Sequence, residues 1–201
     1  MAFTERSAAS RSAIVDAARR LLASKGYEAT TIRAVAAEAG IDASMVMRYY
    51  GSKEGLFAAA VDIDLQLPDA SEWPRGDVGA HLAAHAVARW ESAQSNELMV
   101  MLLRSAATNE AAAGKLREVS AGQVRRFVGS AIGDAPDADR RAGLLSVQML
   151  GMALCRYVLE LPPVAAMDTD DLVAYLAPML QHVLYGDLGA SVTAGQRLSL
   201  H

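Results

Sequence analysis

Two short apolar segments separated by a glycine constrain the fold of this chain more than any other feature of its sequence. The first, IRAVAAEA, follows Thr30 and Thr31, and the second lies in GIDASMVMRYYGSKEGL, from Gly40 to Leu56. Each is about two helical turns long, and isolated helices below roughly 12 residues are marginal in water. Both segments must therefore be stabilised by packing against neighbouring helices.

The composition predicts an all-α fold. Apolar residues make up 52% of the 201 residues and charged residues 21%, which is typical of a globular protein. Alanine-rich stretches dominate and β-branched runs are scarce, which favours helices over strands. We expect about nine helices and no β-strand.

Cysteine usage and hydropathy indicate a cytoplasmic protein. The single cysteine, Cys155, excludes an intramolecular disulfide and fits a reducing compartment. The amino terminus lacks the apolar core of a secretory signal. The longest apolar stretch, residues 144–161, is interrupted by Gln148 and Arg156, so we expect no membrane span.

The helical pattern predicts two helical regions joined by a polar segment. Residues 1–65 should form a compact unit of four helices, the fourth running from Ser52 through LFAAAVDIDL. Residues 66–77, QLPDASEWPRGD, contain two prolines and a glycine and predict a linker or loop. Residues 78–188 should form a second helical region, and residues 189–201 a frayed tail. The further helices are expected near residues 78–92, 96–108, 110–132, 137–160 and 168–185.

Residues 32–50 fit a helix-turn-helix, which needs apolar contacts where its helices cross and a small residue at the turn. Those parts are supplied by Val35, Ala36, Gly40, Ile41 and Val46. If Val46 and Tyr50 face inward, then Ser44 and Arg48 project outward, because successive helical residues are about 100° apart. Charge supports this assignment: the first 60 residues carry more basic than acidic side chains, although the whole chain has a net charge of −4.

The outward face of this second helix suits the major groove of DNA. Arg48 and Ser44 could hydrogen-bond to bases, and the flanking Met45 and Met47 could contact thymine methyl groups. Contacts with the phosphate backbone are predicted for Thr31, Arg33, Tyr49 and Lys53. The alternative is a generic helical hairpin in which Arg48 is merely solvated.

The run from Lys25 to Val61 resembles the DNA-binding domain of the TetR family of transcriptional regulators. The resemblance includes Gly26–Tyr27, Thr30–Thr31, Gly40 and the junction YYGSKE, residues 49–54. It implies a homodimer whose recognition helices enter successive major grooves of a roughly palindromic operator. It also implies an all-helical carboxy-terminal domain that binds inducers.

The chain departs from the family pattern at two positions. Family members often carry a tyrosine where this chain has Met47, and an acid where it has Ala34. A methionine cannot donate a hydrogen bond to phosphate, so that contact would pass to Tyr49.

Apolar stripes on the last two long segments predict a four-helix dimer interface with the symmetry mate. Gly143 and Gly151 would allow close approach of the backbones. The alternative is that both stripes face the core of the same chain. The predicted interface residues are Leu145, Met149 and Met152 on one segment and Leu172, Leu176 (or Tyr175), Met179 and Val183 on the other.

Large and adaptable side chains on the middle helices predict a ligand pocket, because methionine-lined surfaces repack readily around hydrophobic molecules. The same residues could instead be ordinary core. The pocket candidates are Trp90, Met99, Met101, Leu102, Phe127, Met149 and Cys155.

The sequence carries no catalytic or cofactor motif that we would assign. His81 and His85 have a spacing that can hold a metal, but the glutamate of a metalloprotease motif and a third ligand are missing. We therefore expect surface or pocket histidines, no metal, no cofactor and no enzymatic activity. The leading hypothesis is a DNA-binding regulator, a repressor released by a small hydrophobic molecule. The alternatives are an activator of the same family and a helical ligand-binding protein or enzyme without a role in DNA regulation.

Overall fold

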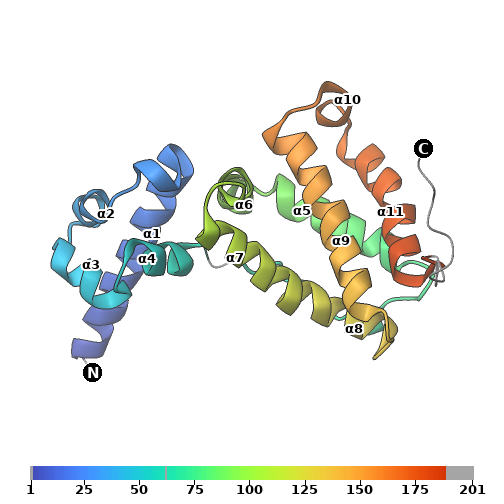
Figure 1. Ribbon diagram of the computed structural model, residues 1–201, viewed down its shortest axis with the longest axis horizontal. Helices are drawn as coiled ribbons and strands as arrows, with labels where there is room; N and C mark the ends of the chain where they lie inside the picture. The colour runs from blue at the N-terminus through green and yellow to red at the C-terminus, as the bar shows by residue number, and fades with distance from the viewer. Residues whose placement is uncertain (1, 62, 189–201) are drawn as a thin grey trace, which may run out of the picture.

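The computed structural model describes residues 2–61 and 63–188, and the described part contains helices and no strand (Figure 1). The all-α prediction is confirmed, and the predicted tail, residues 189–201, lies outside the described residues. No helix in the described part combines the length and apolar character needed to cross a membrane. The amino-terminal region consists of α1 (Ala2–Ala29), α2 (Ile32–Ala39), α3 (Ala43–Tyr50) and α4 (Lys53–Ala60).

The rest of the chain forms a helical bundle. Its first helices are α5 (Val78–Glu91), α6 (Ala93–Ala106), α7 (Glu110–Val119) and α8 (Arg125–Ile132), and its last are α9 (Ala138–Ala153), α10 (Pro162–Ala165) and α11 (Thr169–Tyr185). The π-helical segment η2 (Ser120–Val124) joins α7 directly to α8, so residues 110–132 form one helical run as predicted. A second π-helical segment, η3 (Leu154–Val158), extends α9. The short helix α10 was not predicted.

Polar caps set the start of each of the three short amino-terminal helices. Thr31 Oγ1 accepts a hydrogen bond from the Ala34 N–H at 3.1 Å, which caps α2. Asp42 and Ser52 cap α3 and α4 in the same way. Gly40 adopts φ 66° and ends α2, a left-handed conformation that costs a glycine little. The boundaries of the helix-turn-helix are therefore set by local chemistry.

The fourth helix is shorter than the sequence predicted. It ends at Ala60, not near Leu65, and is followed by a non-helical segment that we call the strap, residues 63–67. Along the strap Ile63 is buried and Leu65 and Leu67 are half-buried, while the two intervening residues are exposed. This alternation places one face of the strap on the core, and Gln66, with φ 50°, departs from a regular extended conformation. The strap is followed by the 3-10 helix η1 (Ala70–Glu72).

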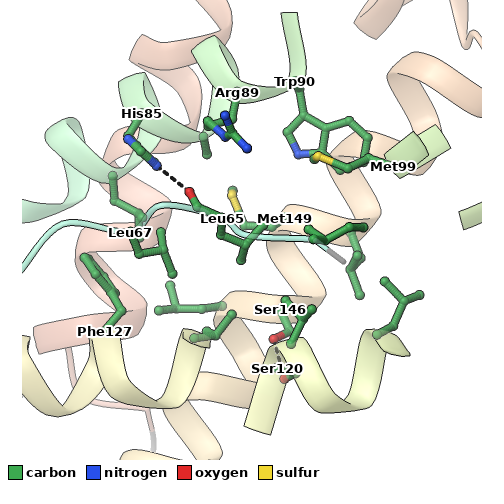
Figure 2. A pocket seen from close by; sticks show the side chains of 18 of the residues that line it. Leu65, Leu67, His85, Arg89, Trp90, Met99, Ser120, Phe127, Ser146 and Met149 are labelled. Carbon is green, nitrogen blue, oxygen red and sulfur yellow. Dashed lines mark hydrogen bonds between the residues drawn. The ribbon is translucent and has the colours of Figure 1, made fainter. Parts of the chain in front are cut away.

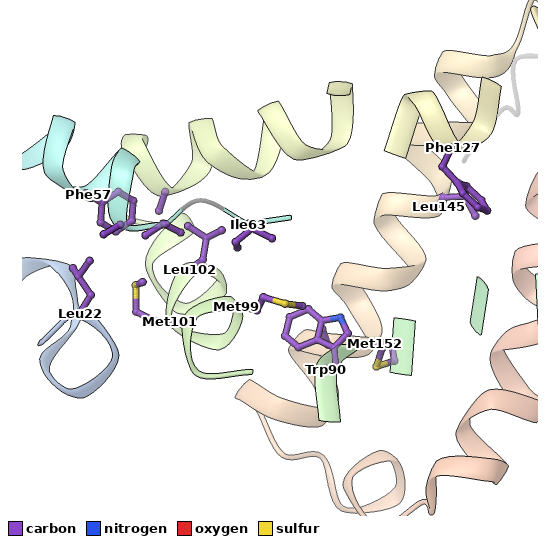
Figure 3. Packing of buried hydrophobic residues seen from close by; sticks show 14 of the residues in the cluster. Leu22, Phe57, Ile63, Trp90, Met99, Met101, Leu102, Phe127, Leu145 and Met152 are labelled. Atoms are coloured by element: carbon purple, nitrogen blue, oxygen red, sulfur yellow. The ribbon is translucent and has the colours of Figure 1, made fainter. Parts of the chain in front are cut away.

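Helix α6 packs against both regions of the protein, using a different side of the helix for each. Met101 lies on the side that packs near Leu22 and Phe57 of the amino-terminal region, whereas Met99 lies beside Trp90 of α5 (Figure 3). The two methionines are two residues apart, which places them about 200° apart around the helix. The buried core therefore continues from the amino-terminal helices into the bundle without a break at α6.

Helices α5 and α11 pack closely against each other, and this packing depends on Gly79. A Cβ atom at this position would lie 2.5 Å from the Ala177 carbonyl oxygen and 2.6 Å from the Gln181 nitrogen. The Gly79 N–H also donates to Gln181 Oε1 at 2.7 Å. A side chain here would push the two helices apart.

We therefore expect Gly79→Ala to lower the free energy of unfolding by about 1–3 kcal/mol, the usual cost of overpacking. Gly114→Ala on α7 is the matched control, because its Cβ would meet only the end of Arg117 at 3.8 Å. The control should leave stability unchanged or raise it by up to about 1 kcal/mol. Urea unfolding followed by circular dichroism at a fixed protein concentration measures both variants, and equal stabilities would contradict the close approach.

Candidate functional site

Helix α3 lies at the outer edge of the amino-terminal region, away from the bundle (Figure 1). It is anchored by Val46, which is 0% exposed and packs in the core with Val35 of α2. The Ile41 N–H donates to the Ala36 carbonyl at 2.9 Å, which fixes the turn between α2 and α3. The predicted helix-turn-helix geometry is present.

The outward face of α3 presents an uncompensated positive charge. Ser44, Met47 and Arg48 are exposed, and Met45 is half-buried. In residues 2–61 and 63–188 no carboxylate pairs with Arg48 or with the exposed Arg33 of α2. The Asp42 cap accepts hydrogen bonds from Ser44, which hold the pKa of that carboxyl below its usual range. Asp42 is thus ionised at neutral pH, but its charge is directed to the start of α3 and does not neutralise Arg48.

Two of the predicted phosphate contacts already have partners within the chain. The Tyr49 hydroxyl accepts a hydrogen bond from Ser7 at 3.4 Å, and the Arg11 guanidinium lies 5.0 Å from the centre of its ring. Lys53 Nζ donates to the Glu28 carbonyl at 3.2 Å. Tyr49 retains its own O–H proton and Lys53 two N–H donors, so each could still reach a phosphate. Thr31 is exposed, with its hydroxyl oxygen accepting the capping bond of α2.

The bundle encloses an apolar cavity of about 110 Å³ between α5, α6, α7, η2, α8, α9 and the strap (Figure 2). Five of the predicted pocket residues line it, namely Trp90, Met99, Leu102, Phe127 and Met149. Other lining side chains are Ile63, Leu65 and Leu67 of the strap together with Leu82, Leu103, Leu116, Val119, Val124, Leu145 and Leu150. The cavity is thus walled by the strap on one side and by helices on the others.

Two predicted pocket residues do not line this cavity. Met101 is buried on the opposite side of α6, and Cys155 lies half-buried in η3. For Met101 the reason is helical phase, because a residue two positions from Met99 faces the other way. Cys155 lies in η3, beyond Leu150, the last residue of α9 that lines the cavity.

Four polar side chains line the cavity, and they are His85, Arg89, Ser120 and Ser146. His85 Nε2 lies 2.9 Å from the Leu65 carbonyl oxygen, and a carbonyl only accepts, so Nε2 carries the proton. Arg89 donates to the Asp64 carbonyl at 2.8 Å and to Gln66 Oε1 at 3.3 Å. Sequence reasoning missed Arg89, although its spacing of four from His85 on α5 places both on one helix face.

A stacked aromatic pair fixes the end of the cavity at Trp90. The Tyr157 ring lies parallel to the Trp90 ring, with 5.3 Å between the ring centroids. The Tyr157 hydroxyl donates to Glu91 Oε1 at 2.9 Å, and Arg156 pairs with the same carboxylate at 3.1 Å. Burial, together with this bond to Glu91, raises the pKa of Tyr157 to about 12, so the phenol remains a donor at neutral pH.

Most residues of the predicted dimer stripes face the core of their own chain. Leu145, Met152, Leu172, Leu176 and Val183 are buried, Met149 lines the cavity and Met179 is half-buried. The exposed apolar side chains of these helices are Val147 on α9, 62% exposed, and Tyr175 on α11, 61% exposed. Gly143 and Gly151 are exposed four residues on either side of Val147, on the same face of α9.

The two histidines do not form a metal site. His81 is exposed, stacks on Trp73 at 4.9 Å and hydrogen-bonds to the Asp77 carbonyl, whereas His85 points to the strap. Within the described ranges no three metal-ligating side chains cluster.

Comparison with known proteins identifies both regions of the chain. The family described as bacterial regulatory proteins, tetR family, matches residues 14–60. The family described as tetracyclin repressor-like, C-terminal domain, matches residues 77–184, which is more than half of the chain. No curated protein matches the sequence.

Solved structures share the fold over almost the whole chain. A TetR-family regulator from Streptomyces coelicolor A3 is 30% identical, with a TM-score of 0.67 over 88% of this chain and 95% of that one. GusR of Salmonella enterica is 18% identical, with a TM-score of 0.62 over 87% and 95% of the two chains. The multidrug binding protein EbrR, solved with proflavin, is 20% identical, with a TM-score of 0.58 over 87% and 99%. On the family matches and the first of these structures, the chain belongs to the TetR family of transcriptional regulators.

Proposed function

We propose that this protein is a repressor that binds a roughly palindromic operator as a homodimer and is released when a small hydrophobic molecule enters the bundle. The observation that carries the proposal is that the strap, which leaves the helix-turn-helix region directly after α4, is itself a wall of the cavity. An occupant of the cavity therefore contacts the segment that holds the DNA-binding helices. Such a protein acts where the chromosome lies, in the cytoplasm.

The DNA-binding face of the proposal is α3. With Val46 holding its inner side, α3 can enter a major groove with Ser44 and Arg48 toward the bases and Met45 and Met47 at the edges. The backbone contacts are Thr31, Arg33, Tyr49 and Lys53. Arg33 and Arg48 have no counter-charge to lose on binding, so both contribute fully to attraction toward phosphate and base.

The link between cavity and DNA-binding region has two routes. The strap is one, and α6 is the other, since Met99 and Leu102 line the cavity while Met101 packs toward α1 and α4. A ligand that displaces Met99 or the strap leucines shifts the population toward a state with a different separation of the two α3 helices. The proflavin complex of EbrR supports a ligand-binding role for this fold.

The dimer interface that we propose is the exposed face of α9 and α11. It contains Gly143, Val147 and Gly151 on α9 and Tyr175 on α11. An added Cβ at either glycine would meet nothing within 4 Å in the single chain, so both positions are open to a partner helix. The two glycines would let a partner helix approach α9 closely, and Val147 and Tyr175 would then be buried against the partner.

A catalytic role is excluded, because TetR-family regulators are transcription factors and not enzymes. The direct test of the proposal is fluorescence anisotropy with the intergenic DNA next to the protein's own gene. We expect tight, palindrome-dependent binding that weakens steeply with salt. Equal affinity for palindromic and non-palindromic DNA, or no binding to DNA, would contradict the proposal.

Arg48→Ala and Arg33→Ala should weaken operator binding in different ways. Loss of the base contact of Arg48 should cost about 1–3 kcal/mol and relax specificity at one base pair in each half-site. Loss of the phosphate contact of Arg33 should weaken binding to all sequences and reduce the salt slope by about 1. Anisotropy titrations against single-base operator variants measure both.

Arg117→Ala is the control for this pair, because Arg117 is a basic residue on α7 that pairs with Glu110 outside the DNA-binding region. It should bind the operator as the unmodified protein does. Unchanged specificity in Arg48→Ala would contradict a base contact.

Val147→Glu should convert the dimer into a monomer, because it places two like charges against each other across a symmetric interface. Ala84→Glu on the exposed side of α5 adds the same charge away from that face and should leave the dimer intact. Light scattering after size-exclusion chromatography distinguishes the two states. A Val147→Glu protein that stays dimeric at micromolar concentration would place the interface elsewhere.

A further inference from the structure

The cavity contains one buried polar atom without a partner, and it belongs to Arg89. In the part of the chain that the structure describes, Arg89 Nε is the buried side-chain nitrogen or oxygen that lacks a hydrogen bond. Figure 2 shows the guanidinium between His85 and Trp90, facing the open space bounded on its other side by Leu65 and Met149. A buried donor without an acceptor is costly, and because protein atoms cover Nε, an acceptor reaches it only when the wall around Arg89 shifts.

The charge of Arg89 is also uncompensated. Its two hydrogen-bond acceptors, the Asp64 carbonyl and Gln66 Oε1, are both neutral. Among the described residues no carboxylate pairs with it. A guanidinium cannot lose its proton in a protein, so Arg89 stays positively charged in the cavity wall, and its bonds to Asp64 and Gln66 lie on the exposed side of that wall.

The other polar groups of the cavity do not compete for an acidic ligand. Ser146 donates to the Ala142 carbonyl at 3.0 Å, so Ser120 is the donor in the 2.7 Å bond between the two hydroxyls. Both serine protons are thus engaged, and only acceptor lone pairs face the cavity. His85 uses its Nε2 proton on the strap. Arg89 is therefore the place where an anion would bind.

From this arrangement we infer that the effector is a small hydrophobic carboxylic acid, whose carboxylate binds Arg89 and whose apolar body lies among Met99, Leu102 and Met149. The inference rests on the proposed function only in calling this ligand an effector. Arginine is suited to the role because its planar fork matches the two oxygens of a carboxylate. At about 110 Å³ the cavity is smaller than the apolar cavity of about 150 Å³ that holds a benzene molecule, so a ring or an alkyl chain fits only when the methionine side chains repack around it.

Binding of the acid would also act on the strap. Arg89 holds the strap through the Asp64 carbonyl and Gln66, and a carboxylate competes for the same guanidinium. A charge-assisted hydrogen bond is stronger than a hydrogen bond to a neutral carbonyl, so the ligand carboxylate would displace the strap from Arg89. Release of the strap at these two residues then frees the segment that follows α4.

The test compares acids with their isosteric amides on the full-length protein. Isothermal titration calorimetry at pH 7 measures benzoate and octanoate against benzamide and octanamide, with Trp90 fluorescence as a second readout. We expect each acid to bind about tenfold to a hundredfold more tightly than its amide. Equal affinities, or no binding of either acid, would overturn the inference.

The variant Arg89→Gln should remove this preference for the acid while leaving the affinity for the amide unchanged. Arg104→Gln, at an exposed arginine on α6 outside the cavity, is the control and should keep the preference. Arg89→Lys keeps the charge without the fork and should show an intermediate preference, and it replaces Arg89→Gln if circular dichroism finds that variant unfolded. A preference for the acid that survives Arg89→Gln at full strength would refute the role of Arg89.

Operator binding separates this inference from the proposed function. If the protein without ligand does not bind its operator but still binds acids more tightly than amides, the proposed function is refuted and the binding of acids at Arg89 is supported. If it binds the operator but shows no preference for acids, the inference fails alone. An acid that binds at Arg89 without releasing the operator would overturn its role as effector.

Discussion

The backbone of the strap, residues 63–67, finds most of its hydrogen-bond partners outside itself, and these bonds join the two regions of the protein. Because it is not helical, its N–H and C=O groups lack the internal partners of a helix. Gln123 accepts from the Leu65 N–H at 2.7 Å and donates to the Ile63 carbonyl at 2.6 Å. His85 and Arg89 bond to the next carbonyl groups. Of the three side chains that hold the segment after α4, His85 and Arg89 also line the cavity.

The helix-turn-helix could be predicted closely because its boundaries depend on local chemistry. Thr31, Asp42 and Ser52 each satisfy free N–H groups at the start of the helix that follows, and Gly40 supplies the left-handed turn. These effects act within four residues, so they can be read from the sequence in order. The buried position of Val46 and the exposed position of Arg48 then follow from helical periodicity alone.

The bundle was harder to predict because its long helices are apolar on more than one side. On α9 both Leu145 and Val147 are large and apolar, yet one is buried and the other is exposed. Periodicity finds such stripes but cannot say which partner, the same chain or a second one, covers each. The strap did have a signal, the alternation in VDIDLQL, residues 61–67, but it continued the apolar pattern of α4 and was read as helix. For Arg89 the spacing of four from His85 indicates a shared helix face, but its lack of a carboxylate partner depends on the strap and has no signal in the sequence.

In the proposed mechanism, the same core residues contribute to stability and to ligand binding, and this limits the size of the regulatory effect. Trp90, Met99 and Leu102 are buried core residues that also line the cavity. A ligand would therefore add van der Waals contacts that these side chains do not make with one another. The total binding energy of the ligand does not determine how far the protein shifts between its DNA-bound and DNA-free states. Only the difference between its affinities for the DNA-bound and DNA-free states does, and by reciprocity operator DNA must weaken ligand binding by the same factor. A ligand that only fills the apolar space stabilises both states alike. A contact that competes with the strap, as at Arg89, favours one of them.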